Sequence, residues 1–430
     1  MTITYLLPIL AALLIVLFYM GLPSLKECPL KRAEPAERRM RRGDWLAAAV
    51  IALCYAVVAF IGLGDTKAAQ NPHVFSPNET VTVELEGAMP ISRLRIFCGI
   101  NVGNYYIECS EDGENWDYAG EFAQNYVAVL KWEEIELSET VTTKPARYLR
   151  ITADNDMYLN EIAVYSPYGD LLGITSADAP ELCDEQELVP DSASFMNSSY
   201  FDEIYHVRTA IEHQKDIWPY EVSHPPLGKL IIGIGISLFG VTPFGWRFMG
   251  TLFGVLMLPV MYVFLKRLFG GKVVPVLGTV IFAADFMHYV QTRIATIDTY
   301  AVFFILLMYL FMYLWCEDGK KRYLALSGLF FGIGAASKWT CIYAGAGLAV
   351  IWALHWIVRA YHRKDEENGG NLFAEFLRNC GFCVVLFVLV PAVIYYVSYY
   401  HYGAAKGLTG VGAFFTKAYA QIVLDNQSFM

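Results

Sequence analysis

The sequence predicts a polytopic α-helical membrane protein with an inserted extracytoplasmic antiparallel β-sandwich. Three observations predict this class. The 430 residues are 56% hydrophobic and 15% aromatic, with a mean hydropathy of +0.38. The chain carries a series of long apolar runs, and a stretch of short alternating segments interrupts them. Such a composition is too apolar for an ordinary soluble protein of this size.

The apolar runs predict about eight membrane spans, because each is long enough, or nearly so, to cross a hydrocarbon core of roughly 30 Å. The fourth and sixth runs are the shortest. The first could instead be a cleaved signal peptide, but a retained anchor is favoured because no basic region precedes the run and no clear cleavage site follows it. The predicted spans cover residues 3–21, 45–64, 246–265, 273–289, 299–316, 323–337, 341–358 and 379–398.

Basic residues in the loops predict the orientation, since short cytoplasmic loops collect Lys and Arg. Every second loop here is basic, so we expect the N-terminus outside, residues 22–44 in the cytoplasm and the segment from about 65 to 245 outside. The protein is thus expected to be integral and multi-pass, with its active face extracytoplasmic. The basic residues are Lys26, Lys31, Arg32, Arg38, Arg39, Arg41, Arg42, Lys266, Arg267, Lys272, Lys320, Lys321, Arg322, Arg359, Arg363, Lys364 and Arg378.

Charge and cysteine usage exclude some classes of protein. The net charge of −10 comes from 32 basic and 42 acidic residues, the acids lying mostly in the outer segment, which argues against nucleic acid as a partner. The nine cysteines are scattered, and the CxxC pair Cys380 and Cys383 lies in an apolar run, so they imply neither a zinc site nor a disulfide framework. Cys98 and Cys109 are left open as a cross-strand disulfide or two buried thiols.

Alternating segments between about Phe75 and Tyr168 predict the sandwich, since a period of two with turns between runs is typical of antiparallel strands. The turn from Ser110 to Trp116, with ARYLRI at 146–151 and LNEIAVY at 159–165, resembles a discoidin-type (coagulation factor C-type) module. That resemblance implies loops at one end that bind sugars or membrane surfaces. The alternative is a spacer. The predicted strands are 81–85, 92–97, 105–109, 147–151 and 161–165.

Acids and bases from four separate chain segments are predicted to meet at the outer membrane face, where charged groups are costly and commonly line a functional cavity. A sugar donor on a polyprenyl phosphate needs cations to hold the phosphate and a carboxylate near the acceptor hydroxyl as general base. The sequence supplies both kinds of group. The residues are Asp202, Glu203, His206, His224, Arg247, Asp285, His288, Arg293, Asp298 and Lys338.

Several of these residues stand in motifs. The acidic pair Asp202-Glu203 precedes the HPPLGK run 224–229, Gln291-Thr-Arg293 precedes Asp298, and Ser337-Lys338-Trp339 follows. As a set they resemble the protein O-mannosyltransferases (dolichyl-phosphate-mannose-protein mannosyltransferases), polytopic membrane glycosyltransferases of the GT-C class, over about residues 198–430.

The resemblance implies a role for each matched residue. Asp202 is expected to be the catalytic base, supported by Glu203, which is grouped with it as catalytic. Donor phosphate binding is expected of Arg247, Arg293 and Lys338, and supporting roles of His224 and Asp298. The two adjacent acids also offer oxygen ligands to a divalent cation, so metal dependence stays open and no metal-ligand residue is named.

The implied reaction is transfer of a sugar, mannose, from polyprenyl (dolichyl-like) phosphate to a hydroxyl acceptor, protein Ser or Thr, on the extracytoplasmic face. The expected partners are that donor, a protein or glycan acceptor, membrane lipid and a second chain completing the C-terminal region, because members of the family continue beyond this length. The alternatives are transfer to lipid or cell-wall glycan, and a non-catalytic glycan-binding membrane scaffold.

The predicted organisation has five parts. These are two transmembrane helices with a basic cytoplasmic loop (1–64), the discoidin-like sandwich (65–170), a polar linker (171–200), an extracytoplasmic catalytic loop with an interfacial helix (201–245), and the GT-C-like transmembrane region (246–430), expected to be incomplete at its C-terminus.

Overall fold

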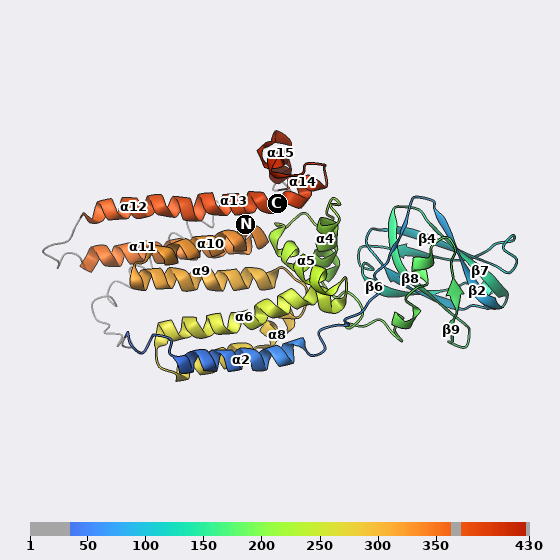
Figure 1. The fold of residues 1–430 in the computed structure, drawn as a ribbon, viewed down its shortest axis with the longest axis horizontal. Helices are drawn as coiled ribbons and strands as arrows, with labels where there is room; N and C mark the ends of the chain where they lie inside the picture. The colour runs from blue at the N-terminus through green and yellow to red at the C-terminus, as the bar shows by residue number, and fades with distance from the viewer. Residues whose placement is uncertain (1–34, 363–370, 427–430) are drawn as a thin grey trace, which may run out of the picture.

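A computed structural model describes residues 35–362 and 371–426. This part of the molecule is elongated, with a bundle of long helices at one end and a β-sandwich at the other, joined by short helices (Figure 1). Several predictions fall outside the described residues, namely the span 3–21 and the loop positions Lys26, Lys31 and Arg32. The same holds for Arg363 and Lys364.

Among the described residues, α3 is the α-helix that lies within the run of strands, and the other α-helices precede or follow the sandwich. The α-helices are α2 (Arg42–Phe60), α3 (Glu139–Thr142), α4 (Glu203–Gln214), α5 (Leu227–Phe239), α6 (Pro243–Phe269), α7 (Val273–Ala283), α8 (Phe286–Thr292), α9 (Asp298–Asp318), α10 (Lys321–Ser337), α11 (Thr340–His362), α12 (Leu372–Val384), α13 (Val390–Ser398), α14 (Tyr400–Ala404) and α15 (Lys417–Asp425). Short 3-10 turns cover Pro180–Leu182, Gln186–Leu188 and Val411–Phe415, and a π-turn, Val385–Leu389, joins α12 to α13.

The membrane region has the predicted helical character. Within the described ranges, α2, α6, α9, α11 and the continuous segment Leu372–Ser398 are long and apolar enough to cross a membrane, and α7 with α8 forms a sixth candidate bent by 56°. The two runs that the sequence marks as shortest are this bent pair and α10. At 17 residues, α10 is shorter than a roughly 30 Å core requires.

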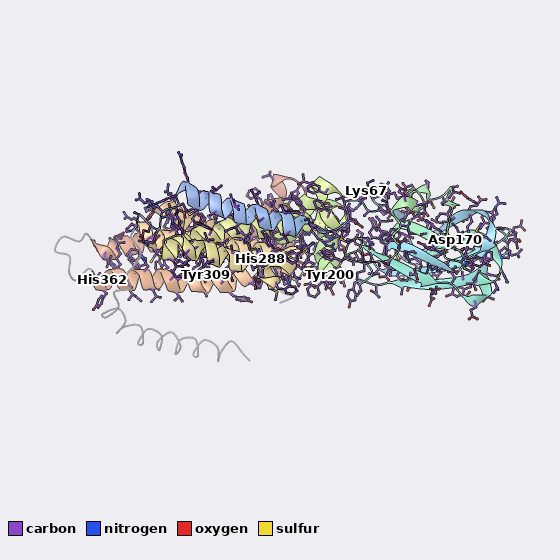
Figure 2. The ribbon with its side chains drawn as sticks, turned by 90° about the horizontal axis from the view of Figure 1, so that it is seen from below. Lys67, Asp170, Tyr200, His288, Tyr309 and His362 are labelled. Carbon is purple, nitrogen blue, oxygen red and sulfur yellow. The ribbon has the colours of Figure 1, made fainter. Side chains whose placement is uncertain are left out.

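Basic residues gather at the end of the bundle away from the sandwich. Arg42 begins α2, Lys266 lies in the last turn of α6, Lys321 begins α10, and Arg359 lies in the last turn of α11. Figure 2 shows His362 at this end, whereas Tyr200 and Lys67 lie at the junction with the sandwich. The distribution agrees with the charge rule that predicts which end is cytoplasmic.

The sandwich consists of two five-stranded antiparallel sheets, one in the order β1-β8-β3-β6 with β9 paired to β8, the other in the order β10-β2-β7-β4-β5. The strands are β1 (His73–Phe75), β2 (Thr80–Pro90), β3 (Arg93–Cys98), β4 (Gly103–Ser110), β5 (Asp117–Gln124), β6 (Lys131–Glu136), β7 (Pro145–Ala153), β8 (Met157–Tyr165), β9 (Leu171–Leu172) and β10 (Ile174–Thr175).

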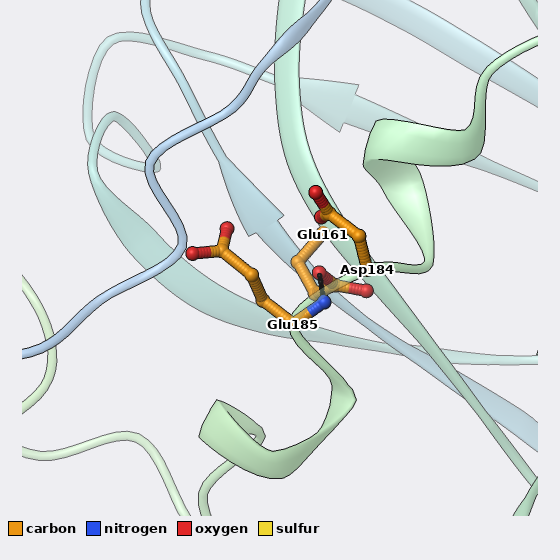
Figure 3. A group of neighbouring side chains, drawn as sticks. All are labelled: Glu161, Asp184 and Glu185. Atoms are coloured by element: carbon orange, nitrogen blue, oxygen red, sulfur yellow. Dashed lines mark hydrogen bonds between the residues drawn. The ribbon is translucent and has the colours of Figure 1, made fainter.

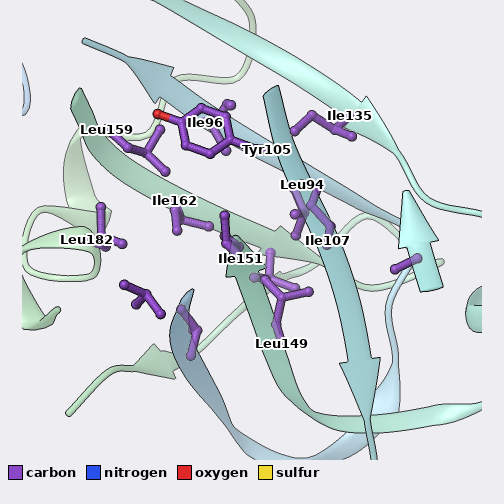
Figure 4. Close-up of a cluster of buried hydrophobic side chains, with 14 of the residues drawn as sticks. Leu94, Ile96, Tyr105, Ile107, Ile135, Leu149, Ile151, Leu159, Ile162 and Leu182 are labelled. Atoms are coloured by element: carbon purple, nitrogen blue, oxygen red, sulfur yellow. The ribbon is translucent and has the colours of Figure 1, made fainter. Parts of the chain in front are cut away.

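Alternate residues of both sheets form the sandwich core. Leu94 and Ile96 of β3 meet Ile107 of β4 and Ile151 of β7, all at most 2% exposed (Figure 4). Burying a side chain of this size stabilises the fold by about 1.5–3 kcal/mol. Every predicted strand is present. Cys98 and Cys109 are buried free thiols on different sheets.

The sandwich extends past its predicted boundary. Leu172 pairs with Val164, and Ile174 pairs with Leu85, so residues 171–175 complete both sheets although the sequence predicts them as linker. The strands β5 and β6 are absent from the sequence prediction. Their exposed positions carry Glu121, Glu134 and Glu136, which weaken the apolar alternation.

Candidate active site

The two adjacent acids lie at the start of α4. Phe201, which precedes them, has a φ of +54°, an uncommon value for a residue with a side chain. Asp202 flanks the helix and Glu203 is its first residue, where a negative charge is favourable to the helix dipole. The backbone N–H of Tyr200 donates to Glu203 Oε2 over 2.8 Å and closes this turn.

Glu203 is fully buried against Arg247 of α6. Arg247 Nε donates to Glu203 Oε1 and Nη2 donates to Oε2, each over 2.7 Å, and both side chains are 0% exposed. The N–H of Ala295 donates to Glu203 Oε1 over 3.0 Å. Both carboxylate oxygens are therefore occupied, which leaves Glu203 no oxygen for a metal ion in this arrangement.

The guanidinium of Arg247 is equally occupied. Besides its two bonds to Glu203, Nη1 donates to the carbonyls of Leu63 and Phe195 over 3.1 and 2.5 Å, and Nη2 donates to the carbonyl of Ser198 over 3.0 Å. These five bonds use all five N–H groups of an arginine. The resemblance implies a phosphate contact for Arg247, whereas every donor of this side chain has a protein partner in the structure.

Local structure explains the position of Arg247. Thr242 caps α6 by accepting the N–H of Gly245 over 2.9 Å, and Pro243 occupies the first helical position, where its missing N–H costs nothing. Arg247 follows about one turn later and reaches the chain on either side of the sandwich, at Leu63 and Ser198. It thereby ties both connections of the inserted module to α6.

Asp202 has a different environment. It is half-buried, and within the described ranges its carboxylate accepts no hydrogen bond, in contrast to Glu203. Burial raises the pKa of Asp202, and the nearby charge of Asp298 raises it further, while Lys338 and His224 lower it. Asp202 is thus a carboxylate open to a proton donor and surrounded by other predicted site residues.

Lys338 and Asp298 form an ion pair at the same end of the bundle. Lys338 Nζ donates to both oxygens of Asp298, over 2.7 and 2.8 Å. Lys338 follows the last residue of α10, and Asp298 begins α9, so the ends of two helices meet here. The side chains are 18% and 46% exposed, which leaves the ammonium accessible to a ligand beside Asp202.

Arg293 does not pair with Asp298. Its Nη2 donates to the carbonyls of Ile61 and Gly62 over 2.8 and 2.6 Å, and Nη1 donates to the hydroxyl of Tyr289. Arg293 therefore links α8 to the chain leaving α2. Asp285 also has a structural partner, because it caps α8 by accepting the N–H of His288 over 2.8 Å.

His224 is held by the loop before α5. Lys229, fully buried, forms an ion pair with Glu221 and donates to the backbone carbonyl of His224 over 3.0 Å. Burial lowers the pKa of His224, and its ring lies 6.2 Å from that of His206. Lys229 is not among the predicted site residues, although a lysine within the apolar run 227–240 indicates a buried partner.

A cavity of about 490 Å³ opens beside Asp298 among α6, α7, α8 and α9. Its lining is mostly apolar, with Phe201, Met257 and Phe282, and its polar groups include Gln291 and Asp298. A cavity of this composition suits a ligand with an apolar tail and a polar head, since apolar walls bind the tail and a few polar groups orient the head.

One group of acids in the sandwich has metal-ligand spacing. Oxygens of Glu161, Asp184 and Glu185 lie within 4.8 Å of one another (Figure 3). The carboxylates have protein partners, however: Glu185 N–H donates to Glu161 Oε2 over 3.0 Å, and Gln70 N–H donates to Glu185 Oε2 over 2.8 Å. These bonds attach the chain entering the sandwich to the segment leaving it.

The comparison with known proteins matches the part of the chain that carries most of these motifs. Residues 223–364 match the family model described as dolichyl-phosphate-mannose-protein mannosyltransferase. This range includes His224, Arg247, Arg293, Asp298 and Lys338, while the acidic pair precedes it.

Curated relatives carry a related name. The polyprenol-phosphate-mannose–protein mannosyltransferase of Corynebacterium glutamicum is 26% identical over 261 residues, 54% of this chain and 48% of that protein. The Mycobacterium tuberculosis protein of the same name is 27% identical over 145 residues, 28% of each chain. The chain thus spans about half, or less, of the length of the curated relatives that it matches.

Among solved structures, the S. cerevisiae protein O-mannosyltransferase Pmt1-Pmt2 complex bound to the sugar donor matches with 20% identity and a TM-score of 0.43, covering 50% of this chain and 31% of that chain. The resemblance predicted from the motifs is confirmed by the family model and the curated relatives. The membrane region of this chain is therefore similar to the dolichyl-phosphate-mannose-protein mannosyltransferases.

Proposed function

We propose that this chain is the membrane part of a glycosyltransferase that moves mannose from a polyprenyl phosphate to a Ser or Thr hydroxyl of a protein on the extracytoplasmic face. The observation that carries the proposal is the contrast between Glu203, whose oxygens are all occupied, and Asp202, whose carboxylate is open beside the Lys338–Asp298 pair. The names of the curated relatives support the donor and the protein acceptor.

The proposed reaction is a single displacement with inversion at the sugar C1. Asp202 accepts the proton of the acceptor hydroxyl as its oxygen bonds to C1, and the bond between C1 and the phosphate oxygen breaks, so the electron pair leaves with polyprenyl phosphate. The role of Asp202 needs an ionised carboxylate within hydrogen-bond reach of the hydroxyl.

Lys338 is the cation best placed for the departing phosphate, because its ammonium is partly exposed and Arg247 has no free donor. A fixed positive charge near the leaving oxygen stabilises the transition state. Arg293 retains the role of a second phosphate ligand in the proposal, with its Nε unpartnered among the described residues. The polyprenyl tail is assigned to the apolar cavity beside Asp298.

The distribution of basic residues supports the membrane orientation in this proposal. The basic residues at the far end of the bundle favour a cytoplasmic location for that end, which would put the acidic pair and the sandwich outside. Arg247 and Glu203 act as positioning residues. They hold the start of α4, and therefore Asp202, against α6.

The proposal is tested by transfer of radiolabelled mannose from polyprenyl-phosphate mannose to a Ser/Thr peptide, using membranes that contain the wild-type chain. We expect a mannosylated peptide with the anomeric configuration inverted relative to the donor. A retained configuration would contradict the single displacement. Labelled lipid or glycan in place of labelled peptide would favour the alternative acceptor, and no transfer from polyprenyl-phosphate mannose would overturn the proposal.

A further inference from the structure

Three tyrosine rings form a stacked row beside Asp202. The rings of Tyr126 and Tyr205 lie 6.1 Å apart with 20° between their planes, and those of Tyr205 and Tyr220 lie 6.4 Å apart with 3° between them. The outer two, Tyr126 and Tyr220, are 44% and 45% exposed. We call Tyr126, Tyr205 and Tyr220 the tyrosine row.

The row combines two parts of the molecule. Tyr126 lies in the loop between β5 and β6 of the sandwich, Tyr205 lies on α4, and Tyr220 follows α4. Tyr205 is three residues after Asp202, and residues three apart lie on one face of a helix. The middle ring of the row therefore lies beside the carboxylate that the proposed function assigns as base.

The sandwich loop is fixed to α4 rather than tethered loosely. Val129 and Leu130 are at most 2% exposed and belong to the same apolar cluster as Val207 and Ile211 of α4. The Ser199 hydroxyl donates to the Val129 carbonyl over 2.7 Å, and the Ser199 N–H donates to the Leu130 carbonyl over 2.8 Å. The position of Tyr126 relative to Asp202 is thus determined by packing.

The central ring of the row stays neutral, and an outer ring lies against a cation. Burial raises the pKa of Tyr205, and its neighbours Tyr126 and Tyr220 raise it further, so its phenol stays protonated at physiological pH. The guanidinium of Arg208 lies 4.1 Å from the Tyr220 ring centroid and bonds to Glu212, which fixes the far end of the row. The row thus offers flat aromatic contact and phenol hydroxyls, with the Arg208 guanidinium against one of its outer rings.

We propose that the tyrosine row is the subsite for the acceptor polypeptide, binding an extended segment of uncharged residues next to the Ser or Thr whose hydroxyl faces Asp202. The inference rests on the proposed function and adds a role for the inserted sandwich, which contributes Tyr126. This proposed role replaces the spacer interpretation, because a spacer would not need an exposed ring beside the candidate active site.

A peptide fits the dimensions and chemistry. An extended chain rises about 3.3 Å per residue, so the two ring spacings correspond to about four residues. Tyrosine offers a large flat contact with little conformational entropy to lose and a hydroxyl that donates or accepts hydrogen bonds, as in antibody combining sites. A peptide backbone with small neutral side chains can pack on the flat rings and form hydrogen bonds with their hydroxyl groups.

The test compares acceptors of two lengths in the mannose transfer assay. For a Ser/Thr peptide of eight residues, Tyr126→Ala is expected to raise the acceptor KM by roughly three- to tenfold, the range that one aromatic contact supplies, with kcat little changed. For a single blocked Thr residue, too short to reach Tyr126, the KM should equal that of the wild type. Tyr126→Phe, which keeps the ring, should largely restore peptide binding.

Tyr168→Ala is the matched control, because Tyr168 is 93% exposed and lies in the turn between β8 and β9. The inference is overturned if Tyr126→Ala and Tyr168→Ala give the same peptide KM. It is also overturned if Tyr126→Ala raises the KM for the lipid donor instead, which would identify the ring as a contact to the membrane surface.

Binding of the same fluorescent peptide, measured by anisotropy with the detergent-solubilised chain, separates this inference from the proposed function. If the wild type transfers no mannose but binds the peptide and Tyr126→Ala weakens that binding, the proposed reaction is wrong while the subsite stands. If transfer requires Asp202 but neither KM nor binding depends on Tyr126, the reaction stands and the subsite is wrong.

Discussion

Glu203 and Arg247 form a fully buried, two-bond ion pair, with Nε–Oε1 and Nη2–Oε2 distances of 2.7 Å. The pair joins the first residue of α4 to the first turns of α6. Because both side chains are 0% exposed and every Arg247 donor is used, the geometry suits the pair to hold the start of α4 against α6 rather than to bind a ligand.

Breaking this pair should unfold the loop. Arg247→Ala would leave the Glu203 charge buried without its cationic partner, which costs about 3–5 kcal/mol. We expect a large fall in the thermal unfolding midpoint of the chain in detergent. Arg359→Ala is the control, since its pair with Glu375 is 45% and 39% exposed and such pairs contribute about 0–1 kcal/mol. Equal midpoints for the two variants would contradict the positioning role.

The pH dependence of transfer should follow Asp202. Its pKa is raised by burial and by Asp298 and lowered by Lys338, and the carboxylate must be ionised to act as a base, so kcat/KM falls as pH falls through this raised pKa. Lys338→Gln should move that acid limb to higher pH, and Asp298→Asn should move it to lower pH. Acid limbs that stay in place in both variants would assign the titration to another group.

Loss of the Lys338 charge should also slow the chemical step. Lys338→Ala is expected to lower kcat by about a hundredfold, the effect of removing one preorganised group that stabilises developing negative charge. Lys320→Ala serves as the control, because Lys320 is 54% exposed and pairs with Asp318 at the opposite end of the bundle. A normal kcat in Lys338→Ala would indicate that Arg293, rather than Lys338, stabilises the departing phosphate.

The raised pKa of Glu161 predicts that the stability of the sandwich depends on pH. Burial raises the pKa of Glu161 to about 8, far above the ordinary value for glutamate, so its contribution is present at low pH and is lost as pH rises through that folded pKa. Relative to the wild type, Glu161→Gln should therefore gain stability between about pH 5 and about pH 9. The thermal unfolding midpoints at these two pH values measure the difference in stability, with Glu111→Gln as the control because Glu111 is exposed. A variant that loses relative stability over this range would contradict the raised pKa.

Much of the architecture could be predicted from the sequence because its signals are local. Apolar runs predict the long helices, alternation predicts five of the strands, and the basic loops predict which helix ends lie together. The bent pair α7–α8 and the short α10 are the two runs that already lacked full length. Strands such as β6 were missed because their exposed charges conceal the period of two.

The site was harder to predict because it depends on partners far apart in the sequence. Asp202 and Glu203 are neighbours in the chain, and their sequence alone does not show that Glu203 is the carboxylate that is buried against Arg247. The partners of Arg247 lie at Leu63, Phe195 and Ser198, which no motif joins. Tyr126 reaches the site through packing of the sandwich against α4, and nothing in its local sequence marks it.

The central claim is that Asp202, and not its neighbour, is the base. The direct measurement is mannose transfer to peptide by Asp202→Asn, alongside its unfolding midpoint. We predict that kcat falls by about 10²–10⁴ while the midpoint stays at or above that of the wild type, because the Asp202 carboxylate has no hydrogen-bond partner among the described residues and its raised pKa reflects an unfavourable charge. Transfer by Asp202→Asn at the wild-type rate would contradict the account.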